Sequence, residues 1–69
     1  MIKYPDETWR DVVERIVKKY YMEHECAMAY DRELRIIKKL KQREPTDDEM
    51  ANAVWEALYE YGIDVEKGK

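Results

Sequence analysis

The sequence predicts an all-α protein: an antiparallel helical hairpin with one long helix and one shorter helix, packed with a second copy as a dimeric bundle. Three observations support this prediction. Apolar residues recur at helical spacing over most of the chain, prolines and glycines occupy only four positions, and a helix-capping motif follows the second proline. A compact three-helix bundle is the alternative.

The long helix is predicted over residues 6–43. Asp6 can cap this helix, or Pro5 can occupy its first turn, with Asp6 and Glu7 near the positive end of the helix dipole. Apolar residues then follow at steps of three and four, which is the spacing of a coiled-coil seam, and they keep this phase as far as Ile37. The first part of this seam consists of Trp9, Val13, Ile16 and Tyr20.

A break within residues 22–31 would give the three-helix alternative. Asp31 can cap a new helix, with Glu33 in its first turn. We favour one continuous helix, because the apolar phase is interrupted only by the polar pair Glu23–His24 and because residues 22–30 contain none of the usual turn-forming residues.

A turn at residues 44–46 is predicted to separate the long helix from a shorter one over residues 47–61. The residue before a proline avoids helical backbone angles, so Pro45 ends the long helix. Thr46 and Glu49 have the spacing of a capping box, in which each side chain accepts a hydrogen bond from the backbone amide of the other residue.

The end of the shorter helix is marked by Gly62. We expect Ile63 to make a hydrophobic contact back to Leu58, as is usual after a helix that ends at a glycine. Residues 64–69 are expected to form a frayed tail. With 69 residues and no linker, residues 1–69 are predicted to be a single helical domain.

The composition indicates a cytoplasmic protein. Cys26 is the only cysteine, so the chain has no internal disulfide, which fits a reducing compartment. No apolar run approaches the roughly 20 residues that span a bilayer, and we expect no membrane association.

Aromatic residues are numerous for so short a chain, with two tryptophans and six tyrosines. Two helices offer too little room to bury all of them, and the N-terminal seam extends beyond the reach of the shorter helix. Tyrosine and tryptophan are also favoured at interfaces. We therefore predict a homodimer, with another protein as a further possible partner. The expected interface residues are Trp9, Val13, Ile16, Tyr20, Tyr21 and Trp55.

Charge is divided unevenly along the chain. Residues 32–43 carry six cations and one acid, a net charge of +5, whereas residues 44–69 carry eight acids and two cations, a net charge of −6. One helix face therefore has a basic stripe of Arg32, Arg35, Lys39 and Arg43. The alternative function is a DNA-binding transcriptional regulator that uses this stripe. We favour pairing of the stripe with the acidic helix, because the whole chain has a net charge of −3.

The side chains that could act in catalysis or bind a metal do not have the spacing that such sites require. We therefore predict no enzyme activity, cofactor or metal. Glu23, His24, Glu25 and Cys26 can all ligate metals, yet consecutive residues of a helix point in different directions. Cys26 is expected to be a buried structural thiol. The favoured function is a small non-enzymatic protein–protein interaction module, such as a regulator, inhibitor or assembly factor.

Overall fold

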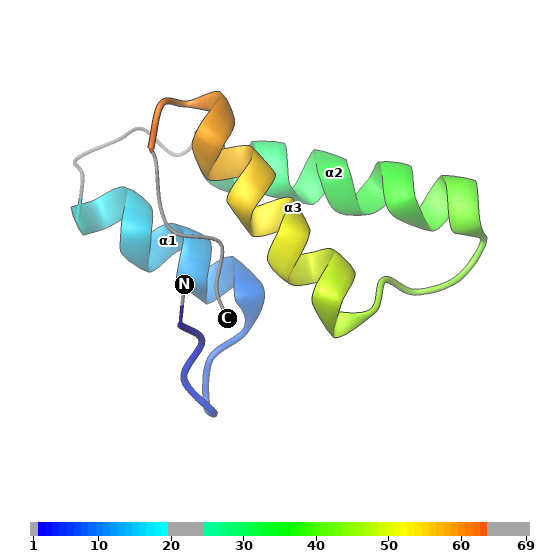
Figure 1. Ribbon diagram of the computed structural model, residues 1–69, viewed down its shortest axis with the longest axis horizontal. Helices are drawn as coiled ribbons and strands as arrows, with labels where there is room; N and C mark the ends of the chain where they lie inside the picture. The colour runs from blue at the N-terminus through cyan, green and yellow to red at the C-terminus, as the bar shows by residue number, and fades with distance from the viewer. Residues whose placement is uncertain (1, 20–24, 64–69) are drawn as a thin grey trace.

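Three α-helices form the described part of the protein. The computed structural model describes residues 2–19 and 25–63, and within these residues there are helices and no strands. The helices are α1 (Trp9–Lys19), α2 (Glu25–Lys41) and α3 (Asp47–Glu60) (Figure 1). The radius of gyration is 11.4 Å, close to the ~11 Å expected of a globular chain of this length. The prediction of an all-α protein is confirmed.

The range predicted as one long helix, 6–43, contains both α1 and α2. Its continuity depends on residues 20–24, which lie outside the described residues, as does the predicted tail at 64–69. Within the described residues each helix contacts the other two, so α1 and α2 pack side by side. Figure 1 shows α1 at one end of the α2–α3 pair and the turn between α2 and α3 at the other end.

The first helix begins at Trp9, three residues after the predicted start, because Thr8 caps it. The Thr8 Oγ1 accepts a hydrogen bond from the Asp11 amide at 3.2 Å, and the Asp11 Oδ2 accepts one from the Thr8 amide at 2.9 Å. This is a capping box with aspartate at the third helical position. Pro5 and Asp6 instead lie in a turn before the helix.

The second helix ends at Lys41, two residues before the predicted end. Gln42 follows it with a φ of 54°, in the left-handed region. The Gln42 amide donates to the Lys38 carbonyl at 2.9 Å, which satisfies one of the last carbonyls of the helix. Glycine is the usual residue in this conformation, because a Cβ atom there costs about 1 kcal/mol.

The third helix has the caps that the sequence predicted. The Thr46 Oγ1 accepts from the Glu49 amide at 3.2 Å, and the Glu49 Oε1 accepts from the Thr46 amide at 2.9 Å. At the other end Gly62 has a φ of 79°, and the Ile63 amide donates to the Leu58 carbonyl at 3.0 Å. This pattern is a Schellman motif, which brings Ile63 back onto the core.

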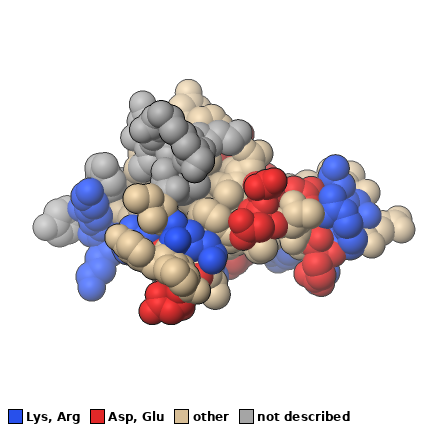
Figure 2. Space-filling model, turned by 60° about the horizontal axis from the view of Figure 1, so that its bottom comes forward, with Lys and Arg blue, Asp and Glu red and all other residues tan. Residues whose placement is uncertain are grey.

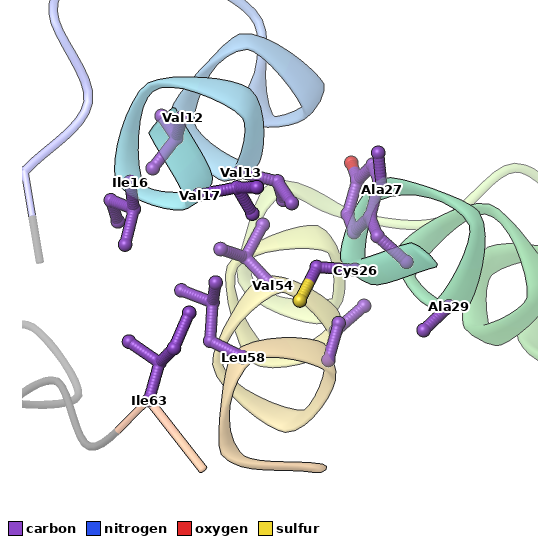
Figure 3. Packing of buried hydrophobic residues seen from close by; sticks show 13 residues of the cluster. Val12, Val13, Ile16, Val17, Cys26, Ala27, Ala29, Val54, Leu58 and Ile63 are labelled. Carbon is purple, nitrogen blue, oxygen red and sulfur yellow. The ribbon is translucent and has the colours of Figure 1, made fainter. Parts of the chain in front are cut away.

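The core lies between the three helices and is built mainly from small or β-branched side chains. Figure 3 shows these side chains pointing toward one another from the three helices. Leu58 is the largest side chain that is fully buried. Because alanines and valines dominate, the helices can approach closely. The core residues are Val12, Val13, Ile16 and Val17 of α1; Cys26, Ala27, Ala29 and Tyr30 of α2; Ala53, Val54, Ala57 and Leu58 of α3; and Ile63.

Candidate functional site

Much of the interface predicted on the first helix is buried in the chain's own core. Val13 is fully buried, Ile16 is 9% exposed, and Trp9 is half-buried against the same core. Tyr20 and Tyr21 lie outside the described residues. Because α2 and α3 already cover Val13 and Ile16, these residues need no second copy to remove them from water.

Trp9 links the first and third helices. Its indole Nε1 donates to the Asp47 Oδ1 at 2.7 Å, and Asp47 is the first residue of α3. The ammonium of Lys3 lies 5.8 Å from the centre of the Trp9 ring, at cation–π distance. In this conformation Trp9 joins the N-terminal segment, α1 and α3.

Trp55 is the one residue of the predicted interface that lies on the third helix. It is half-buried. Its ring stacks on that of Tyr59, with centroids 5.4 Å apart and an angle of 16° between the planes. Tyr59 is 60% exposed, so this pair presents aromatic surface to solvent.

The predicted basic stripe is half neutralised by the acidic third helix. Arg32 pairs with Glu60 at 3.1 Å, and Arg43 pairs with Glu49 at 2.6 Å. The predicted pairing of the stripe with the acidic helix is therefore confirmed for two of its four cations. The other two, Arg35 and Lys39, are exposed and have no ion pair among the residues that the structure describes.

Further ion pairs surround the turn between the second and third helices. Lys38 pairs with Glu44 at 2.9 Å, and Lys41 lies 4.0 Å from Glu49. Figure 2 shows blue and red atoms adjoining at the right-hand end of the molecule, where this turn lies. The Arg43 guanidinium and the Thr46 amide lower the pKa of Glu49 to about 2. Charge of both signs is largely balanced at this end.

Two of the buried core side chains, Tyr30 and Cys26, carry a group that can ionise. Burial raises the pKa of Tyr30 to about 12, because the ionised phenolate loses its hydration there. Cys26 is buried as the sequence predicted, and Figure 3 shows its sulfur pointing into the cluster. Among the described residues, no group of three or more His, Cys, Asp and Glu side chains is placed to hold a metal ion. His24 and Glu23, which can ligate metals but for which the sequence predicts no metal site, lie outside the described residues.

The second helix also carries exposed apolar residues that the sequence analysis did not select. Ile36 is 46% exposed and Leu40 is 78% exposed. They lie one helical turn apart and follow Arg32 at steps of four, so all three share one side of the helix. We call Arg32, Ile36 and Leu40 the α2 ridge. The sequence feature that could have identified this ridge is that Ile36 and Leu40 are apolar but fall outside the seam that contains Ile37.

A second exposed ridge runs along the third helix. Residues at steps of four again share one side, and every one of them is exposed. The Arg32–Glu60 pair joins this side of α3 to the α2 ridge. We call Asp48, Asn52, Glu56 and Glu60 the α3 ridge. Because a short turn connects the two helices at the opposite end, the ridges run in opposite directions on one exposed face of the molecule.

Comparisons of the chain with protein-family models, curated proteins and solved structures each found no match. In the described residues, no helix has the length and apolar character needed to cross a bilayer.

Proposed function

We propose that this protein is a small non-enzymatic interaction module that binds another protein chain through the face formed by the α2 and α3 ridges. The observation that carries this proposal is the exposure of Ile36 and Leu40, at 46% and 78%, on adjacent turns of a charged helix. Single exposed apolar residues are common on protein surfaces. Two on one side of a helix form a continuous apolar strip, which is a typical anchor for a partner.

The charged residues around this strip support a protein partner. Interfaces commonly combine an apolar centre with a polar rim. Here Ile36 and Leu40 supply the centre, whereas Arg35, Lys39 and Glu56 supply exposed charges of both signs. A partner with a matching apolar strip and complementary charges would bury the centre and pair with the rim. The buried Cys26 thiol is in keeping with a reducing compartment, and we propose a cytoplasmic location.

Site-specific photo-crosslinking in the native cell tests this proposal. A photoreactive amino acid is placed at Leu40, and in a control at Ile2, which is 67% exposed and precedes α1. We expect a discrete adduct with a protein from position 40 and no such adduct from position 2. Loss of the position-40 adduct in the Ile36→Glu background would tie the contact to the apolar strip. Absence of an adduct from position 40, and also from a second probe placed at Ile36, would contradict the proposal.

DNA binding through the basic stripe is the second candidate, and Arg35 and Lys39 are the residues that favour it. Contacts to phosphates would make duplex binding fall steeply with salt. The exchange of both residues for glutamine leaves the ion pairs of Arg32 with Glu60 and of Arg43 with Glu49 intact. A salt-sensitive complex of the parent protein with duplex DNA that the double exchange abolishes would favour this candidate over the first.

A further inference from the structure

The α2 ridge has the opposite charge to the α3 ridge. The side of α2 that carries Ile36 and Leu40 is bordered by Arg35 and Lys39, which have no ion pair in the described residues. These cations are one turn apart, like the two apolar residues. This half of the exposed face is therefore both apolar and positively charged.

The α3 ridge supplies the opposite charge on the same face. Asp48 and Glu56 are exposed and, within the part of the chain that the structure describes, neither forms an ion pair. Tyr59, beside this ridge, is 60% exposed and stacks on Trp55. This half of the face is therefore negative and bordered by aromatic rings, which can pack on apolar side chains and on cations.

We infer that the partner at this face is a second copy of the chain, with the α2 ridge of each copy packed on the α3 ridge of the other. The inference rests on the proposed function and identifies its partner. A two-fold axis that runs along the face, between α2 and α3, places each α2 over the α3 of the other copy. The cations Arg35 and Lys39 of each copy then approach the acidic α3 ridge of the other copy, and Ile36 and Leu40 are covered in both copies. A contact of this kind is isologous and closes as a dimer.

Charge decides between the two symmetric arrangements of this face. The other two-fold arrangement would place α2 on α2, so that Arg35 and Lys39 of each copy approach the same cations of the other copy. Like charges in contact oppose association. Arg35 and Lys39 have no ion pair in the described residues that would offset this repulsion, so the α2-on-α3 arrangement is favoured.

The size of the face also suits a dimer. A stable interface takes about 600–800 Å² from each partner. That is roughly 12–15% of the 5217 Å² accessible surface of this protein. The 14 residues of α3 extend over about 21 Å, and two adjacent helices of about 10 Å diameter present a face of about 20 Å in width. A flat projection of about 400 Å² corresponds to a larger accessible area, because side chains make the surface uneven.

Sedimentation equilibrium of the full chain tests the inference. Measurements from micromolar to millimolar protein in low salt should show a reversible monomer–dimer equilibrium. Salt should weaken the dimer, because exposed charge pairs are screened. Leu40→Glu should raise the dissociation constant at least tenfold, since it removes a buried apolar contact at each of two equivalent positions. Ile2→Glu is the matched control, with the same kind of change at an exposed position before α1, and should leave the constant unchanged.

Reversing the charges on α2 or on α3 tests the α2-on-α3 arrangement as well as the identity of the partner. Arg35→Glu/Lys39→Glu alone and Asp48→Lys/Glu56→Lys alone should each be monomeric, because each places like charges opposite one another. An equimolar mixture should restore a heterodimer, seen as a return of the dimer mass, because both of its α2-on-α3 contacts then bring opposite charges together. Circular dichroism of every variant checks that the helices are retained, and a variant that loses them is replaced by the corresponding single exchange.

Each outcome has a distinct meaning. A parent protein that stays monomeric at millimolar concentration overturns the second copy as partner, and a position-40 adduct with a different protein would then still support the proposed function. A dimer that Leu40→Glu and both charge variants leave unchanged also overturns the inference, because the contact would lie elsewhere. A dimer that needs Leu40 but is not restored in the mixture overturns the α2-on-α3 arrangement.

Discussion

Exchange of Thr46 for alanine tests how the third helix begins. The change removes the hydroxyl that accepts from the Glu49 amide at 3.2 Å, whereas the Glu49 Oε1 can still accept from the amide of residue 46, now at 2.9 Å. Thr46 is exposed, so its truncation leaves no cavity. The expected loss is therefore that of one helix cap, about 1 kcal/mol. For a chain of 69 residues the whole free energy of unfolding is roughly 3–10 kcal/mol, so this loss is readily measured.

Urea unfolding followed by far-ultraviolet circular dichroism is the assay. With a slope of about 1 kcal/mol per molar urea, the midpoint should fall by about 1 M at unchanged slope. Thr46→Ser keeps the accepting oxygen and should lie within about 0.3 kcal/mol of the parent protein, because serine caps helices as well as threonine does. Equal midpoints for Thr46→Ala and the parent would refute the cap, and an equal loss in Thr46→Ser would assign the effect to the methyl group instead.

Four further changes test the core, the turn and the titrating groups. Leu58→Ala should lower the free energy of unfolding by about 3 kcal/mol in the same assay, because it empties the largest fully buried position. Gln42→Gly should raise it by about 0.5–1 kcal/mol, because glycine adopts the left-handed conformation without strain. Arg43 lowers the pKa of Glu49 to about 2 in the folded state. Stability from this group should therefore be complete above its ordinary pKa of 4.5 and lost as the pH falls from 4.5 toward 2, and Glu49→Gln should remove that part of the acid dependence. Burial raises the pKa of Tyr30 to about 12, so its contribution should be lost as the pH rises from 10 toward 12, and Tyr30→Phe should delete the latest phase of a tyrosine absorbance titration.

The third helix was predictable because its signals are local in the sequence. Pro45, the Thr46–Glu49 box and Gly62 act through backbone angles and hydrogen bonds within a few residues, so they do not depend on the rest of the fold. The start of the first helix could be read in the same way. Asp6 and Thr8 are both suitable caps by residue type, but of the two only Thr8 has an acidic residue three positions later, at Asp11. The spacing of the pair, rather than the single capping residue, identifies the start.

The role of the apolar seam could not be predicted from the sequence. Steps of three and four show which side of a helix avoids water, and Val13 and Ile16 are indeed buried. Val12 and Val17, which lie off the seam, are buried as well, so the apolar side of α1 is wider than a coiled-coil contact requires. The hydrophobic effect is non-directional and does not depend on which chain supplies the covering surface. The same seam can therefore be buried by a second copy or by other helices of the same chain.

The residues that remain after the core has been assigned are therefore the ones that bear on a partner. Val13 and Ile16 are buried in the core and are not available to a partner. Ile36 and Leu40, which fall outside the seam, are exposed and can contact one. Neither residue belongs to the core cluster, and Leu40, at 78% exposed, contributes little to the burial that folds this chain. Their exposure next to unpaired charges on the same helix is a feature that folding alone does not explain, and association with another chain would both cover the apolar strip and pair the charges. We therefore expect Leu40→Glu to leave the free energy of unfolding of the separate chain unchanged within about 0.5 kcal/mol, while any association through this face is weakened. A large loss of monomer stability in Leu40→Glu would instead place Leu40 in the packing of the fold and would remove the basis for the proposed surface.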